Sequence, residues 1–145
     1  MIRRIAVFVV AALVAFVAAS LIHTQIILAG LSDLGADIPL SLRISTSLAD
    51  LAGLVFSFGV VIAIALLLGL LVAGLARRYV PLPRPLAFAI AGAGAMATAL
   101  WLMHLGFDIT PIASARTPGG VLLLCLAGAL GGAIFAIGSK PRSGH

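Results

Sequence analysis

At 145 residues, the chain is long enough for one small domain. Hydrophobic residues make up 63% of it and charged residues only 9%, whereas soluble domains have about 45–50% and about 25%. So few charges cannot cover a water-facing surface, which excludes a soluble globular protein and predicts an integral membrane protein. The formal net charge of +5 is not arranged as a basic stripe with interleaved aromatic residues, so no nucleic-acid binding is expected.

Four apolar segments are long enough to cross the hydrocarbon core of a bilayer, which takes about 20 helical residues. They run over about residues 5–29, 51–76, 86–107 and 121–138. Because backbone groups in lipid must be paired within their own segment, each is predicted to be a helix. The sequence therefore predicts an all-α integral membrane protein, a single four-transmembrane-helix bundle over residues 1–145 with a cytoplasmic tail at 139–145.

Proline and threonine mark where two of the predicted helices begin. Pro85 suits the first turn of the third segment, since the N–H that it lacks would have no partner there in any helix. Thr117 directly precedes Pro118, and its hydroxyl is a suitable N-cap for the last helix. These signals predict a short turn before the third helix and a defined start for the fourth.

The charged residues are divided unequally between the two sides of the predicted bundle. One set of helix ends carries only basic residues: Arg3, Arg4, Arg77, Arg78, Arg84, Lys140 and Arg142. The opposite ends carry all the acidic residues together with two arginines: Asp33, Asp37, Asp50, Asp108, Arg43 and Arg116. Because cytoplasmic loops of membrane proteins are enriched in Lys and Arg, we expect both termini in the cytoplasm of a bacterial-type inner (plasma) membrane.

The first segment also has features of a cleavable secretory signal peptide. Arg3 and Arg4 precede an apolar stretch that reaches Ala18, Ala19 and Ser20. The apolar run continues well past that small-residue sequence, however, so we predict an uncleaved anchor. Cleavage would leave three spans with the N-terminus outside.

The longest predicted connection, residues 30–50, has a helical pattern of its own. Polar residues fall on one face of it, and apolar residues recur at helical spacing on another: Leu40, Ile44 and Leu48. A single helix over residues 39–76 would be about 57 Å long, far more than a bilayer. We therefore predict an amphipathic helical outer loop near the interface, then a bend, then the span at 51–76. A short extended segment within this loop is the alternative.

Small residues spaced four apart let helices approach closely in lipid, where there is little hydrophobic drive between them. Such residues occur in all four predicted spans: Ala11, Ala15 and Ala19; Gly53 and Ser57, with Gly69 and Ala73; Ala91, Ala95 and Ala99; Gly128, Gly132 and Ala136. We expect them to form the packing seams of the bundle. An interface to a second copy or to a partner subunit is the alternative.

Polar side chains near the outer ends of the first three spans form one candidate site. Its candidate ligand-binding residues are His23, Gln25, Arg43, Asp50, Trp101, His104 and Asp108. Polar residues within spans are functional candidates, although at the membrane edge they equally suit hydrogen bonds that fix helix register. The alternatives are haem b between His23 and His104, a quinone or lipid headgroup bound by the cluster, and a proton or cation path through Asp50.

No catalytic residue and no metal site is predicted. The single cysteine, Cys125, cannot form an internal disulfide and lies inside an apolar run. The histidines show no HExxH or comparable ligand spacing. The sequence also lacks a spacing that would indicate a Ser/His/Asp arrangement or a pair of catalytic carboxylates.

The sequence favours a small, non-catalytic accessory, anchor or assembly partner of a larger membrane complex, without a cofactor. Its expected partners are the lipid bilayer and other membrane subunits, or further copies of itself. The short extramembrane parts and the aliphatic inner half of the spans favour this function. A redox or ligand-binding membrane subunit with a site at the outer leaflet is one alternative. A small transporter is another, although the spans carry no charge at mid-depth.

Overall fold

The computed structural model describes residues 2–35, 37–79, 81–107 and 116–139, and all regular structure in these residues is helical. The elements in chain order are α1 (Ile2–Asp33), α2 (Leu40–Leu54), the π-helical η1 (Val55–Gly59), α3 (Val60–Ala76), α4 (Arg84–Phe107) and α5 (Pro118–Gly138). They form four helices that are long and apolar enough to cross a membrane, counting α2, η1 and α3 as one. The prediction of an all-helical chain with four such helices is confirmed. Asp108, Lys140 and Arg142 lie outside the described residues.

The second long helix differs from the prediction in where it becomes irregular. Helical structure begins at Leu40 and passes without a break through residues 50 and 51, where a bend was predicted. The irregularity is the π-helical segment four residues further on, at Val55–Gly59. At its end Gly59 lies against the Phe16 ring of α1, where a Cβ would sit 3.4 Å from the ring. The alternative of a short extended segment within residues 30–50 is wrong for residues 40–50, because all of them are helical, whereas Pro39 directly before them has an extended backbone.

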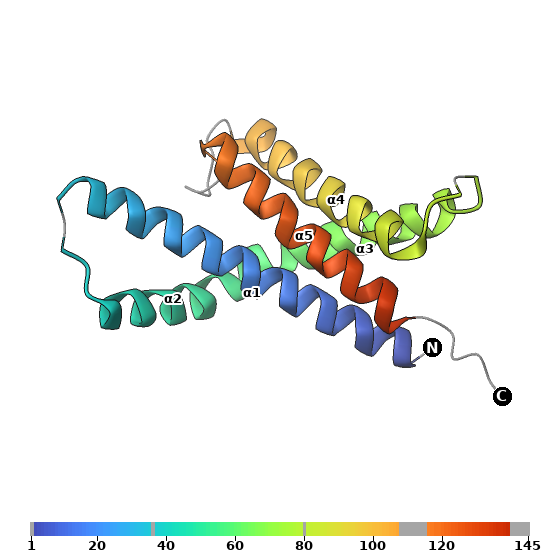
Figure 1. Cartoon of the computed structure of the whole chain (residues 1–145), viewed down its shortest axis with the longest axis horizontal. Helices are drawn as coiled ribbons and strands as arrows, with labels where there is room; N and C mark the ends of the chain where they lie inside the picture. Colours follow the sequence, from blue (N-terminus) through green and yellow to red (C-terminus); the bar gives the residue numbers. More distant parts are fainter. Residues whose placement is uncertain (1, 36, 80, 108–115, 140–145) are drawn as a thin grey trace.

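Helix α5 lies in the middle of the bundle, between α1 and α4 (Figure 1). Helix α3 packs mainly against α4, while α2 packs mainly against α1. The first turn of α1 and the end of α5 lie at the same end of the molecule, where the Arg3 side chain donates a hydrogen bond of 3.0 Å to the Gly138 carbonyl. We call this end, which also carries Arg4 and the α3–α4 turn, the basic end.

Glycines allow α4 and α5 to approach each other at backbone distance. A Cβ on Gly92 of α4 would collide with the carbonyl oxygen of Gly128, and a Cβ on Gly132 would collide with that of Phe88. Gly128, Gly132 and Ala136 are buried, as small residues in a close helix contact must be. Gly92 was not among the residues predicted to pack, although it supplies the α4 side of the contact.

The opposite face of α5 receives α1 in a similar way. A Cβ on Gly131 would lie 2.9 Å from the Cβ of Ala15 and 3.1 Å from the carbonyl oxygen of Ala11. Ala11, Ala15 and Ala19 are all fully buried. Helix α5 therefore presents small residues to two neighbours at once.

Gly69 plays the corresponding part between α3 and α4. A Cβ on it would lie 2.7 Å from the Cβ of Ala95 and 2.9 Å from the carbonyl oxygen of Ala91. Ala99, one turn further, is half-buried. Gly53 and Ser57 are exposed, and a Cβ on Gly53 would meet nothing within 4 Å. This last pair takes no part in the packing of the described helices, because both residues lie on the exposed side of their helix.

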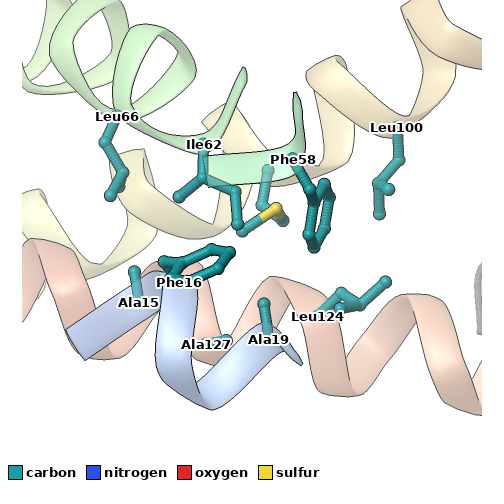
Figure 2. Close-up of a cluster of buried hydrophobic side chains, with 10 residues drawn as sticks. Ala15, Phe16, Ala19, Phe58, Ile62, Leu66, Leu100, Leu124 and Ala127 are labelled. Carbon is teal, nitrogen blue, oxygen red and sulfur yellow. The ribbon is translucent and has the colours of Figure 1, made fainter. Parts of the chain in front are cut away.

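The core is filled by larger side chains that point toward one another from all the packed helices. Figure 2 shows Phe16 of α1, Phe58 of η1 and Leu124 of α5 in this cluster. Ile62, Leu66 and Leu100 complete it from α3 and α4. A second, smaller cluster lies nearer the basic end and consists of Leu70, Ala73, Phe88 and Ala136.

Two elements extend past the other helices at the end opposite the arginines. Counting about 20 residues, the length of a span, from Arg4 along α1 leads to Thr24. Helix α1 continues to Asp33, which adds about 13 Å at 1.5 Å per residue. Figure 1 shows the resulting pair of helices reaching beyond α4 and α5. We call residues 25–54, as far as they are described, the projecting hairpin.

Candidate functional site

The best-defined polar contact between helices at this end joins Thr24 of α1 to Asp50 of α2. The Thr24 hydroxyl lies 2.8 Å from Asp50 Oδ2 and 3.0 Å from the carbonyl oxygen of Ser20. A hydroxyl has one proton to donate, so it serves one of these acceptors at a time. Thr24 is buried and Asp50 half-buried. A hydrogen bond to a carboxylate in such a place is stronger than an ordinary one in water.

One further polar contact ties α2 to α1 along the projecting hairpin, and another lies within α2 beside it. Arg43 Nη1 donates a 3.4 Å hydrogen bond to Gln25 Oε1 at its exposed edge. Ser47 is buried, and its hydroxyl donates to the carbonyl oxygen of Arg43 at 2.8 Å. The polar residues of α1 and α2 thus lie along one helix–helix seam. This placement suits hydrogen bonds that fix the register between the two helices, which is one of the roles that the sequence allows for the cluster.

His23 belongs to the same neighbourhood. It is half-buried on α1, directly before Thr24, and close enough to Asp50 to interact with its charge. The structure therefore brings together four of the predicted site residues on the projecting hairpin and at its base: His23, Gln25, Arg43 and Asp50. Thr24, which was not among the candidate ligand-binding residues, lies between them.

The remaining predicted site residues are on α4 and stand apart. Trp101 is 63% exposed and His104 is exposed as well. Helix α4 packs against α5 and α3, whereas the hairpin residues lie on α1 and α2, which pack against each other. Asp108 falls outside the described residues. The sequence could not show this separation, since equal depth along two helices does not establish which helices are neighbours.

This arrangement bears on the cofactors considered for the cluster. Haem ligation needs two imidazoles that face each other across the iron, and the helices that carry His23 and His104 do not pack face to face. Within the described residues no three His, Cys, Asp or Glu side chains group closely enough to hold a metal ion. Haem b between His23 and His104 stays an alternative that this arrangement of the described helices does not favour.

Ser20 lies with the other polar residues in the outer third of the first span but was not among the candidate ligand-binding residues. Its side chain is fully buried, one turn before Thr24, and its hydroxyl has no hydrogen-bond partner among the described residues. The four-residue spacing of Phe16, Ser20, Thr24 and Leu28 is the signal that could have identified it, since these buried residues form one stripe of α1.

The basic end contains a second polar arrangement, which the sequence had indicated only as a sign of orientation. Arg84 Nη2 donates to the carbonyl oxygen of Ser139 at 3.0 Å and to its hydroxyl at 2.8 Å. The guanidinium carbon of Arg84 lies 5.8 Å from the centre of the Phe88 ring. Together with Arg3, which holds the Gly138 carbonyl, Arg84 satisfies carbonyl groups that the end of a helix leaves free.

Comparisons with protein-family models, with curated proteins and with solved structures found no match to this chain. The function proposed below therefore rests on the residues and their geometry.

Proposed function

We propose that the chain is a multi-pass protein of a bacterial-type plasma membrane, with both termini in the cytoplasm. Its four long apolar helices are compatible with this location. The arginines of the basic end support the orientation, since Lys and Arg collect on the cytoplasmic side. The projecting hairpin, which carries Asp33 and Asp50, would then stand at the outer surface.

In that membrane we propose that the protein is a non-catalytic assembly partner of a larger complex. The observation that carries this proposal is the free face of α2. Its large apolar side chains are exposed at one-turn spacing: Leu40, Ile44 and Leu48, at 72%, 55% and 61%. They lie in the part of the chain that extends past α4 and α5, where α2 packs mainly against α1 and η1 among the described elements.

The chemistry of this face indicates what would cover it. A row of exposed aliphatic side chains is costly in water and is typical of protein or membrane contacts. The apolar row lies about a quarter of a turn around α2 from the polar seam with α1, so a partner helix could pack on it without replacing the hydrogen bonds of the hairpin. We propose that the partner is another membrane subunit that presents an apolar helix at the outer surface.

A matched pair of substitutions on α2 tests this function. Ile44→Glu places a charge in the exposed apolar row, while Ser45→Glu places it on an adjacent exposed position of the same helix. We expect Ile44→Glu to reduce the share of protein that migrates as a larger complex after mild solubilisation of native membranes. Ser45→Glu should leave that share unchanged. A monomer without any co-purifying protein, or equal effects of the two variants, would contradict the proposal.

A second candidate function is ligand binding at the base of the hairpin. The buried Ser20 hydroxyl, which has no partner among the described residues, favours it because such groups usually bind a partner or an ordered water. Thr24 and Asp50 lie next to it. A Ser20→Ala variant that kept its complex but lost binding of a quinone or a lipid headgroup would support this function over the first.

A further inference from the structure

Ser20 differs from the other buried hydroxyl groups of α1 and α2. Thr24 and Ser47 each donate a hydrogen bond to the backbone carbonyl four residues earlier. The Ser20 side chain is fully buried, yet its hydroxyl has no hydrogen-bond partner among the described residues. Buried polar groups that lack a protein partner usually bind water or an ion. The Ser20 hydroxyl therefore marks a place where a small ligand is expected.

The packing of α1 against the second long helix shows what Ser20 faces. Phe16 lies against Gly59 at the end of η1, and Thr24 contacts Asp50 of α2. These contacts are eight positions apart on α1 but nine apart on the other helix, which is the one residue that a π-helical turn adds. Ser20 lies midway between Phe16 and Thr24 on the same stripe of α1. It therefore faces the start of η1, where the backbone departs from the regular helix.

Next to Ser20, the contact between Thr24 and Asp50 supplies oxygen atoms that suit a hard cation. The Thr24 hydroxyl oxygen lies 2.8 Å from Asp50 Oδ2 and 3.0 Å from the Ser20 carbonyl oxygen. When its proton goes to that carbonyl, lone pairs of the hydroxyl and the carboxylate remain for a cation. The Ser20 side chain is one helical turn away, where Cβ atoms are about 5–6 Å apart. Two oxygen ligands at about 2.3–2.6 Å from one ion span a similar distance.

The charge of this place and its burial favour sodium. Asp50 contributes one negative charge, and one monovalent ion balances it. A divalent ion would leave a net positive charge, which is costly away from water. His23 also interacts with the Asp50 charge, but a histidine is largely neutral at about pH 8. The two hydroxyl residues are 0% and 1% exposed, which suits a small ion that has lost its water shell.

We propose that Ser20, Thr24 and Asp50 bind one sodium ion between α1 and the second long helix, beside the start of η1. Asp50 is only half-buried, so the ion enters from the end that carries the projecting hairpin. The bound ion holds α2 against α1 in addition to the hydrogen bond of Thr24. This inference rests on the second function proposed above, ligand binding at the base of the hairpin, and names the class of ligand. The assembly function of the free face of α2 does not depend on it.

The test measures amide hydrogen exchange of the full chain in detergent micelles. Sodium chloride is compared with choline chloride at equal ionic strength and at about pH 8, where histidine is largely neutral. Choline is too large for a place closed by fully buried side chains. Local opening of α2 separates Asp50 from Thr24, so a bound ion opposes it. We expect exchange within residues 40–54 to be at least about threefold slower in sodium chloride when the ion exceeds about twice its dissociation constant.

Variants of the ligands connect this difference to the site. Ser20→Ala and Asp50→Asn each remove an oxygen ligand, and their exchange should be the same in the two salts. Ser47→Ala is the matched control, because Ser47 is also buried but its hydroxyl bonds the Arg43 carbonyl within α2. It should keep the threefold difference between the salts. The two salts are compared within each variant, so a change in stability alone does not imitate the loss of the ion.

Three results would overturn the proposal. One is equal exchange of the unaltered protein in the two salts, which needs no variant and would leave a bound water as the partner of Ser20. Another is a difference between the salts that persists in Ser20→Ala or in Asp50→Asn. The third is a stronger effect of calcium chloride than of sodium chloride at equal concentration. If sodium has no effect but Ser20→Ala loses binding of a quinone or a lipid headgroup, the second proposed function stands without the ion.

Discussion

Arg84 and Ser139 join the start of α4 to the end of α5 through two hydrogen bonds, of 3.0 Å to the backbone carbonyl and 2.8 Å to the hydroxyl. The contact spans 55 positions of sequence and caps a helix whose last carbonyl groups would otherwise lack donors. The contact thus connects α4 to α5 and also caps the end of α5.

Replacing Arg84 should therefore loosen the end of α5. Hydrogen bonds that involve a charged group contribute about 1.5–3 kcal/mol each when they are shielded from water, and this one is only partly buried. We expect Arg84→Ala to lower the free energy of unfolding by about 1–2 kcal/mol, measured by dodecyl sulfate titration in lipid-free micelles. Arg78→Ala, at an exposed position of the adjoining turn, should change it by less than about 0.5 kcal/mol.

The contact between Thr24 and Asp50 should control how firmly α2 is held against α1. Thr24→Val keeps the shape of the side chain but removes the donor, which leaves a half-buried carboxylate with one partner fewer, at a cost of about 1–3 kcal/mol. We expect several-fold faster amide hydrogen exchange within residues 40–54. In the control Thr98→Val, the lost hydroxyl bonds only to its own helix. Equal exchange in both variants would show that this contact does not hold the hairpin.

Gly92 should be far more sensitive to substitution than Gly94, although both lie on α4. A Cβ on Gly92 would collide with the Gly128 carbonyl, whereas one on Gly94 would meet nothing within 4 Å. Gly92→Ala must push α4 away from α5, and overpacking of this kind costs about 1–3 kcal/mol. Gly94→Ala should be neutral or stabilising by up to about 1 kcal/mol, since alanine favours helix. Thermal unfolding of the two variants in detergent distinguishes them.

The proposed orientation is open to a direct labelling experiment. Cys125 is the single cysteine of the chain, so a Cys125→Ser background allows one new thiol at a time. We expect Ser45→Cys to react with a membrane-impermeant maleimide added to intact spheroplasts. Arg78→Cys should react only after the membrane is opened. The reverse pattern would invert the proposed topology.

The long helices could be predicted because each is a continuous apolar run bounded by recognisable signals. Thr117 is an example, since its hydroxyl accepts a 3.1 Å hydrogen bond from the Gly120 amide, as an N-cap should. The start of α2 at Leu40, directly after Pro39, likewise follows from local sequence.

Which helices are neighbours could not be predicted, because spacing within one helix does not identify its partner. Gly131 faces α1 while Gly128 faces α4. In the sequence, both glycines are surrounded by the same kinds of small and apolar residues. For the same reason the sequence grouped His23 with His104, which the bundle places on helices that do not pack face to face. The π-helical segment was also beyond prediction, since it ends where Gly59 meets Phe16, a contact between residues far apart in sequence.

The position of α5 has a consequence for how the protein is made. Ribosomes deliver this helix after the other three, yet two of the close helix contacts, with Gly92 on one side and Ala15 on the other, are made through it. Until α5 has been inserted, α1 and α4 lack the surface that joins them. In the proposed membrane location, the pair of α3 and α4 could therefore form first, and α1 would be joined to it only once α5 is in place.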